Sequence, residues 1–369
     1  MSIEQYQCFP ETYAEGREWF AQTVQQCDGL YESRVNPDVV GAVGETLSTD
    51  VGWFGPREAS RVFVSICGTH GQEYFSGAAT QLNWMLSGGP AKLADDVAVC
   101  LIHCNNPYGA SFLSRGNENF VDLNRNYLDF SQPIRPNPLY DDLFKLLFTP
   151  EMSEHVLDDV MQGYVRFMEE TDPQAAMTTV GGGQNTHPSG IIYCGDELQW
   201  STRNMQAIVD TYLDQAKTVA LIDWHTGLGE FGETSCLFNN LRKDSDEFRW
   251  ACAWWGRAED ASGVYDAGVY PDFVGNVDAG ISEQLQRRGV KVAATVIEFG
   301  TVDNRTVIPA LLIDRWLRFE CQDPQSPHAV RMRTMMMERL NPSQYNWREA
   351  VRNKSLAIYQ NTLAGLSLW

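Results

Sequence analysis

The sequence is poor in basic residues for its length, and several features that mark other classes of protein are missing from it. Its 369 residues contain 28 Lys and Arg against 48 Asp and Glu, so the formal net charge is −20. A surface with this excess of negative charge repels nucleic acids and anionic membranes, which argues against a role at either. The chain also has no internal repeat, no low-complexity tract and no apolar run long enough to span a bilayer.

The beginning of the chain and its cysteines carry no sign of secretion. Residues 1–6 have neither the basic region nor the apolar region of a signal peptide. The nine cysteines are scattered, mostly through apolar runs, without closely spaced pairs, a pattern typical of reduced core residues. We therefore expect a cytoplasmic protein. Since 43% of the residues are hydrophobic, we also expect it to fold on its own core.

Apolar runs predict the centre of the fold. Four such runs, each expected to form a buried strand, occupy residues 61–67, 97–103, 219–225 and 291–297. The stretch Ser76 to Leu86 has helical character and lies between the first two runs, which is typical of a strand-helix-strand unit in a largely parallel sheet. We therefore predict an α/β fold with a central mixed, mostly parallel sheet flanked by helices.

The remaining segments are assigned around this sheet. Residues 1–35 show helical periodicity and are expected to form a helix on the outside of the sheet. The looser pattern of residues 127–218 is interpreted as an insertion that covers one edge of the site, and residues 306–369 as C-terminal helices. All of these parts are predicted to form one domain, residues 1–369.

Chemistry is suggested first by a turn after the first strand. His70 and Glu73 are three residues apart in a turn relieved by glycine, and imidazole and carboxylate are both good zinc ligands. The spacing alone also fits an ordinary arrangement, in which His70 ends a strand and Glu73 lies in the first turn of a helix.

Other strand ends strengthen the metal interpretation. The third strand ends at His225 and the fourth is followed by Glu298, so a parallel sheet would bring both residues to the same edge as His70 and Glu73. Two histidines and one glutamate form a set of three ligands that leaves a coordination position open for water, as catalytic zinc sites do. Glu298 would then be free to act as the general base.

With these residues in view, the chain resembles the zinc carboxypeptidase superfamily, whose members are similar to carboxypeptidase A. The resemblance covers roughly residues 60–305 and rests on four motifs in the order of that family, namely His70-Gly71-Gln72-Glu73, Asp122-Leu123-Asn124-Arg125-Asn126, His225 and Glu298. Within the superfamily, the chain looks most like a bacterial carboxypeptidase-like branch related to succinylglutamate desuccinylase and aspartoacylase.

The resemblance implies roles for particular residues. It makes His70, Glu73 and His225 the ligands of Zn²⁺ and Glu298 the group that activates the zinc-bound water. By the same resemblance, Asn124 and Arg125 grip a free carboxylate of the substrate, Asp122 orients the first zinc histidine, and Arg115 polarises the scissile carbonyl.

Some positions keep a plainer alternative. Arg125 could instead form a structural ion pair, and Asp223 could either support His225 or be only a polar residue at a strand end. His103 is most simply a buried histidine, and His187 a solvated turn residue. A catalytic tyrosine is not marked by a motif, and Tyr265 and Tyr270 are the candidates.

The sequence thus predicts a zinc metallohydrolase of the carboxypeptidase type. Its substrate is expected to be a small molecule or short peptide that has an amide bond next to a free carboxylate. The alternatives are an N-acyl amino acid deacylase of the desuccinylase/aspartoacylase type and a non-catalytic zinc-binding or ligand-binding protein. The oligomeric state stays open.

Overall fold

The computed structural model describes residues 8–239, 241–242, 244–256, 272–301 and 307–369. The strands of these residues are β1 (Leu30–Val40), β2 (Thr46–Phe54), β3 (Arg61–Cys67), β4 (Val97–His103), β5 (Thr218–Gly227), β6 (Thr234–Leu237) and β7 (Lys291–Gly300). The α-helices are α1 (Tyr13–Gln26), α2 (Tyr74–Leu86), α3 (Pro107–Phe112), α4 (Tyr140–Leu147), α5 (Glu154–Glu170), α6 (Pro173–Gly181), α7 (Trp200–Tyr212), α8 (Asp246–Trp255), α9 (Val277–Gln286), α10 (Val307–Phe319), α11 (Pro327–Leu340) and α12 (Tyr345–Leu368). Three short 3₁₀-helices are η2 (Gly71–Glu73), η3 (Pro90–Lys92) and η4 (Leu123–Arg125).

A single seven-stranded sheet forms the centre of the molecule. Its strand order is β1-β2-β4-β3-β5-β7-β6. The four central strands β4, β3, β5 and β7 are parallel to one another, whereas β1, β2 and β6 join the sheet antiparallel. The prediction of an α/β fold with a mixed, mostly parallel sheet is therefore confirmed.

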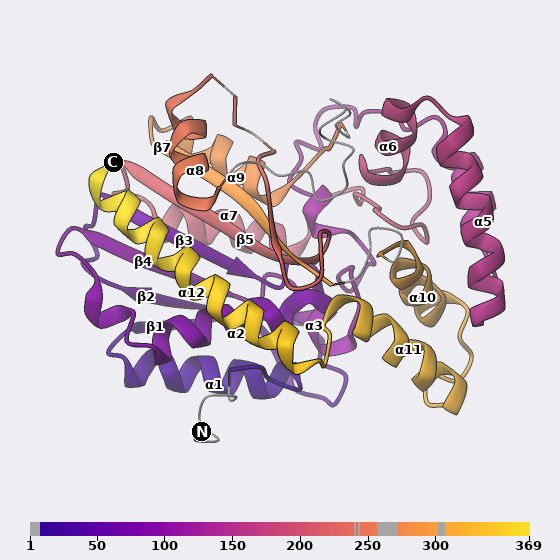
Figure 1. Cartoon of the computed structure of the whole chain (residues 1–369), viewed down its shortest axis with the longest axis horizontal. Helices are drawn as coiled ribbons and strands as arrows, with labels where there is room; N and C mark the ends of the chain where they lie inside the picture. The colour runs from indigo at the N-terminus through magenta and orange to yellow at the C-terminus, as the bar shows by residue number, and fades with distance from the viewer. Residues whose placement is uncertain (1–7, 240, 243, 257–271, 302–306) are drawn as a thin grey trace.

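Helices cover both faces of the sheet, which explains why the central strands are apolar on both sides. Alternate residues of β3 point to opposite faces: Phe63 packs in a core with α1, α2, α8 and α12, while Val62 and Val64 pack in a second core with α7 and α9. In Figure 1, α12 runs across the front of the sheet, and α7 and α9 lie behind it.

A third apolar cluster lies beside the sheet. It joins α4 and α5 to α10 and α11. Figure 1 shows α5, α6, α10 and α11 at one end of the molecule. Within residues 127–218, α4, α5 and α6 belong to this lateral group, whereas α7 packs on the sheet.

The end of α11 and the beginning of α12 reach back to the sheet. Trp347 is fully buried and donates its indole N–H to the carbonyl oxygen of Gly300, the last residue of β7, at 2.8 Å. Thr301 donates its hydroxyl to the carbonyl of Arg339 at 2.6 Å, and Thr226 on β5 donates to the carbonyl of Leu340. These bonds fix the carboxyl ends of two central strands.

The N-terminal part differs from the helix predicted for residues 1–35. Among the described residues of this range, only Tyr13–Gln26 is helical, and β1 begins at Leu30. Thr12 caps the N-terminus of this helix, because its side chain accepts a hydrogen bond from the Glu15 N–H. In the part of the chain that the structure describes, no helix is both long enough and apolar enough to cross a membrane.

Candidate active site

The candidate site lies at the carboxyl ends of the parallel strands. His225 on β5 and Glu298 on β7 are register partners in adjacent parallel strands, so their side chains lie on the same face of the sheet. His70 and Glu73 follow β3, the neighbour of β5 on the other side. The structure therefore brings together the four residues that the sequence analysis placed at one edge.

Glycines shape the turn that carries the first two of these residues. Gly68 has a φ of +68°, a left-handed conformation that a residue with a side chain rarely adopts. At Gly71, a Cβ atom would lie 1.9 Å from the carbonyl carbon of Gly109 in α3, so no side chain fits there. The close approach of α3 holds the turn so that His70 and Glu73 face the site.

Three possible metal ligands meet beside this turn, two from the turn and one, His225, from β5. His70 Nδ1 lies 2.9 Å from Glu73 Oε1, His225 Nδ1 lies 3.2 Å from Glu73 Oε2, and the two Nδ1 atoms are 3.1 Å apart. All three residues are buried, and one ligand atom from each lies within 4.8 Å of the others.

The outer nitrogens of both histidines contact carboxylates. His70 Nε2 is 3.1 Å from Asp122 Oδ1, and His225 Nε2 is 2.9 Å from Asp223 Oδ2. Because an ionised carboxylate can only accept, these contacts assign the proton of each neutral imidazole to Nε2 and leave both Nδ1 lone pairs facing Glu73. Two imidazole nitrogens and a carboxylate that face one another in this way can share a cation, and this set of donor atoms fits a bound zinc ion.

The electrostatics of the cluster also favour a cation. Burial alone would raise the pKa of Asp122, but the charges of Arg115 and His70 outweigh burial and hold that pKa well below its ordinary value. Burial lowers the pKa of His225, yet Asp223 and Glu73 outweigh it, and the net pKa is raised well above its ordinary value. A place that attracts a proton so strongly is also one that attracts a metal ion, which competes with protons for the same lone pairs.

Glu298 differs from Glu73 and Asp122 because the nearby positive charges of His225 and Arg115 do not outweigh the effect of burial on its pKa. It is 8% exposed, and its Oε2 atom lies 3.4 Å from the backbone N–H of Leu228. Burial, followed by the negative charge of Glu73, raises the pKa of Glu298 from 4.5 to about 7. A carboxyl with a pKa near neutrality is well matched to taking up and releasing a proton.

Arg115 lies beside the three possible ligands and is firmly held. Its Nε donates to Asp122 Oδ2 at 2.9 Å, and its Nη1 lies 3.6 Å from Glu73 Oε1. Its backbone N–H donates to Asp314 Oδ2 on α10 at 2.7 Å. The sequence analysis did not single out Asp314, because its partners lie about two hundred residues away.

Asn124 and Arg125 reach the same cavity but also have structural contacts. Asn124 Oδ1 accepts a hydrogen bond from the Val277 N–H at the start of α9. Arg125 Nε donates to the carbonyl of Gly181 at 2.9 Å, and its guanidinium lies 4.8 Å from the centre of the Phe273 ring.

A cavity of about 340 Å³ connects these groups. His70, Glu73, His225, Glu298 and Arg115 form its polar part, with Asn124 and Arg125. Much of the remaining wall is apolar and comes from α5, α6, α10 and the sheet; its larger side chains are Tyr164, Met177, Val180, Ile192, Leu237, Phe273, Val296, Val307, Ile308 and Leu311. Tyr164, Met177, Val180 and Ile192 lie within residues 127–218, the segment expected from the sequence to cover the site, and the other apolar side chains lie outside it.

The other residues considered from the sequence lie elsewhere. His103 is buried, stacks on Phe20 and contacts Tyr74 and Gln81, and burial lowers its pKa to about 3, which is consistent with a neutral core histidine. His187 contacts Asp141 at 2.8 Å near the molecular surface.

The two candidate tyrosines, Tyr265 and Tyr270, lie outside the described residues.

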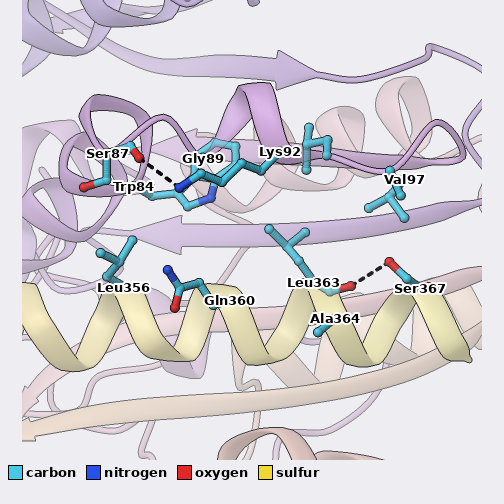
Figure 2. Close-up of a pocket in the computed structure, with 12 residues that line it drawn as sticks. Trp84, Ser87, Gly89, Lys92, Val97, Leu356, Gln360, Leu363, Ala364 and Ser367 are labelled. Carbon is cyan, nitrogen blue, oxygen red and sulfur yellow. Dashed lines mark hydrogen bonds between the residues drawn. The ribbon is translucent and has the colours of Figure 1, made fainter.

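A second cavity lies near the opposite edge of the sheet. Figure 2 shows it between the end of α2 and α12, with Trp84 and Leu363 among the residues that line it, and its volume is about 240 Å³. The cluster of His70, Glu73 and His225 is the group of three suitable ligands found in the described part of the chain, and it lines the other cavity. The candidate metal site therefore lies in the cavity at the carboxyl ends of the strands.

Comparison with known proteins places the chain in a family. The model of the family described as "Protein of unknown function (DUF2817)" matches residues 9–354, and the chain belongs to this family. A search of curated proteins gives no significant match.

Solved structures resemble the chain only distantly. Bovine thrombin-activatable fibrinolysis inhibitor is 14% identical, with 89% of this chain and 96% of that chain covered and a TM-score of 0.46. Carboxypeptidase A from Helicoverpa armigera is 9% identical, with coverages of 89% and 73% and a TM-score of 0.46. Murein-tripeptide amidase MpaA from Escherichia coli O157 is 13% identical, with coverages of 88% and 98% and a TM-score of 0.38.

Proposed function

We propose that this protein is a zinc-dependent hydrolase that cleaves an amide bond in a small substrate with a free carboxylate. The observation that carries the proposal is the convergence of His70, Glu73 and His225 beside Glu298 in one cavity. The three residues would hold the ion through two Nδ1 atoms and a carboxylate. When bound, zinc would supply a Lewis acid that lowers the pKa of water and polarises a carbonyl.

The protein groups around the ion have distinct parts in this reaction. Glu298, with a pKa of about 7 in the metal-free site, accepts the proton of the attacking water and can pass it to the leaving nitrogen. Arg115 lines the same cavity and presents a guanidinium held in place by Asp122, so its donors can stabilise the negative charge that develops on the carbonyl oxygen.

Arg125 is the group proposed to bind the substrate carboxylate. Its contacts with Gly181 and Phe273 fix the guanidinium in the cavity wall, which reduces the entropy lost when a carboxylate binds. A planar fork can form two parallel hydrogen bonds to a carboxylate and so orient the amide as well as attract it.

The cavity favours a peptide-like substrate over an acylated dicarboxylic amino acid. Among the described residues that line it, Arg115 and Arg125 are the cations; Arg115 is proposed to act on the carbonyl oxygen and Arg125 on a carboxylate. A substrate with several carboxylates would leave some of them without a cationic partner, which is costly in a buried site. The apolar wall instead suits a substrate with one carboxylate and a bulky apolar group.

A direct test is to screen the zinc-loaded protein by mass spectrometry against dipeptides and matched N-acyl amino acids. We expect cleavage of substrates that combine a C-terminal carboxylate with an apolar side chain, and at least a hundredfold loss in Glu298→Gln. Preferred cleavage of N-succinyl or N-acetyl acidic amino acids would support the deacylase alternative. Zinc binding with no hydrolysis of either class would favour a binding protein.

A further inference from the structure

A line of hydrogen bonds links the turn that carries His70 to the strand that carries His225. Asn105 Nδ2, after β4, donates to Thr69 Oγ1 at 3.4 Å. Thr69 then donates its hydroxyl to Asp223 Oδ1 on β5 at 3.0 Å, and Asp223 Oδ2 contacts His225 Nε2 at 2.9 Å. Thr69 directly precedes His70, so this line runs across the ends of the neighbouring strands β4, β3 and β5 and joins the segments that carry the two histidines.

The direction of these bonds is determined by the chemistry of the groups. An amide NH₂ only donates and an ionised carboxylate only accepts, so the Thr69 hydroxyl must accept from Asn105 and donate to Asp223. His225 must then donate from Nε2, which leaves its Nδ1 lone pair directed at the metal-binding position. Both oxygens of Asp223 are used, one for the turn that carries His70 and one for His225.

We propose that Thr69 and Asp223 form a positioning pair that fixes the spacing of His70 and His225 for zinc. This inference rests on the proposed zinc site and adds a determinant of metal affinity to it. Asp223 supports His225 directly, whereas Thr69 anchors the backbone immediately before His70. A ligand pair held in this way loses little freedom when the ion binds, so the ion should bind more tightly.

Because the pair is buried, its energetic cost should depend on whether a metal ion is bound. Thr69 and Asp223 have no exposed surface, and among the described residues the ion pairs of Asp223 involve only His225. Asp122, the corresponding carboxylate at His70, is also paired with Arg115. A buried carboxylate without a permanent cation is costly, and a bound metal ion would offset that cost through His225.

The test compares Thr69→Val, which keeps the shape but removes the hydroxyl, with Thr69→Ser, which restores it. Thr80→Val is the matched control, because Thr80 is a buried threonine in α2 whose hydroxyl donates to the carbonyl of Gly77, away from the site. Zinc affinity is measured by competition with a chromophoric chelator, and the ligand field by the visible spectrum of the cobalt(II)-substituted protein. Thermal unfolding of the metal-free proteins shows whether each variant folds.

Thr69→Val should bind zinc on the order of ten- to a hundredfold more weakly and show an altered cobalt spectrum, while Thr69→Ser stays within about threefold of the wild type. Asp223→Asn should lose more zinc affinity than Thr69→Val, because its amide presents an N–H where a carboxylate oxygen accepted a hydrogen bond. Wild-type affinity and spectrum in a folded Thr69→Val protein would overturn the proposal, as would an equal loss in Thr80→Val.

Zinc affinity does not depend on turnover, so the two proposals can fail separately. A wild-type protein that binds zinc but hydrolyses no amide contradicts the proposed function, and weaker zinc binding by Thr69→Val would still support the positioning pair. A wild-type protein that binds no zinc would overturn both.

Discussion

Replacing Glu298 with glutamine should make the metal-free protein more stable while making the enzyme far less active. The Glu298 carboxyl is buried, and burial together with the charge of Glu73 raises its pKa from 4.5 to about 7. Because one pKa unit corresponds to about 1.4 kcal/mol, ionised Glu298 lowers the free energy of unfolding by roughly 3 kcal/mol above neutral pH. Glutamine has nearly the same shape and no charge to desolvate.

The raised pKa also determines how this effect depends on pH. Well below pH 4.5 the carboxyl is protonated in both the folded and the unfolded protein, so it costs nothing. Between pH 4.5 and about 7 the unfolded chain ionises first, and the folded state loses stability as pH rises. The advantage of Glu298→Gln should therefore be under about 1 kcal/mol near pH 5 and roughly 3 kcal/mol near pH 8.

Urea denaturation of chelator-treated proteins at these two pH values measures the effect. Glu283→Gln is a suitable control, because Glu283 is exposed on α9 and its replacement should change stability by less than about 0.5 kcal/mol. With zinc and substrate present, Glu298→Gln should lose on the order of a hundred- to ten-thousandfold in kcat. A stability gain that is absent near pH 8, or equal at both pH values, would refute the raised pKa.

Three further predictions follow from the site. Arg125→Lys keeps the charge but loses the planar fork, so KM for a carboxylate substrate should rise by about tenfold; an unchanged KM in steady-state assays would contradict carboxylate binding. Elemental analysis should find one zinc ion per chain, lost in both His70→Ala and His225→Ala, and retention of zinc by either folded variant would disprove the ligand set. A cation near Glu298 lowers its pKa, so log(kcat/KM) should fall with decreasing pH from a point at or below about 7, and a flat profile would exclude Glu298 as the base.

The parts of the fold that the sequence predicts are those with a simple apolar pattern. The four central strands are continuous apolar runs because helices cover both faces, and a run of this kind needs no knowledge of its partners. β2 escaped prediction because its buried residues include Ser48, Thr49 and Asp50. The side-chain partners of Thr49 and Asp50 lie far away in the sequence, at the carbonyl of Cys104 and the Arg17 guanidinium, and the backbone N–H of Ser48 donates to the Tyr13 hydroxyl.

The same distinction applies to the candidate site. The convergence of His70, His225 and Glu298 was predictable because parallel strands end at one edge of a sheet. The contact between Thr69 and Asp223 was not, since neither residue type indicates which of many polar groups it will meet across 154 residues. Nor did the motif reveal that the Asn124 side chain also accepts a hydrogen bond from the first N–H of α9, which ties the proposed substrate-binding residue to the placement of that helix.

The hydrogen bonds that join the sheet to the end of α11 and the start of α12 bear on the order in which the molecule is made. The proposed zinc ligands and the proposed base all precede residue 300, but Arg339, Leu340 and Trp347 hold the strand ends that present His225 and Glu298. While these later residues are still inside the ribosome, the nascent chain contains the proposed ligands but lacks the hydrogen bonds that hold the strand ends in place. We therefore expect firm zinc capture to follow the docking of α12, so that the reactive centre matures only after the apolar face of the sheet has been covered.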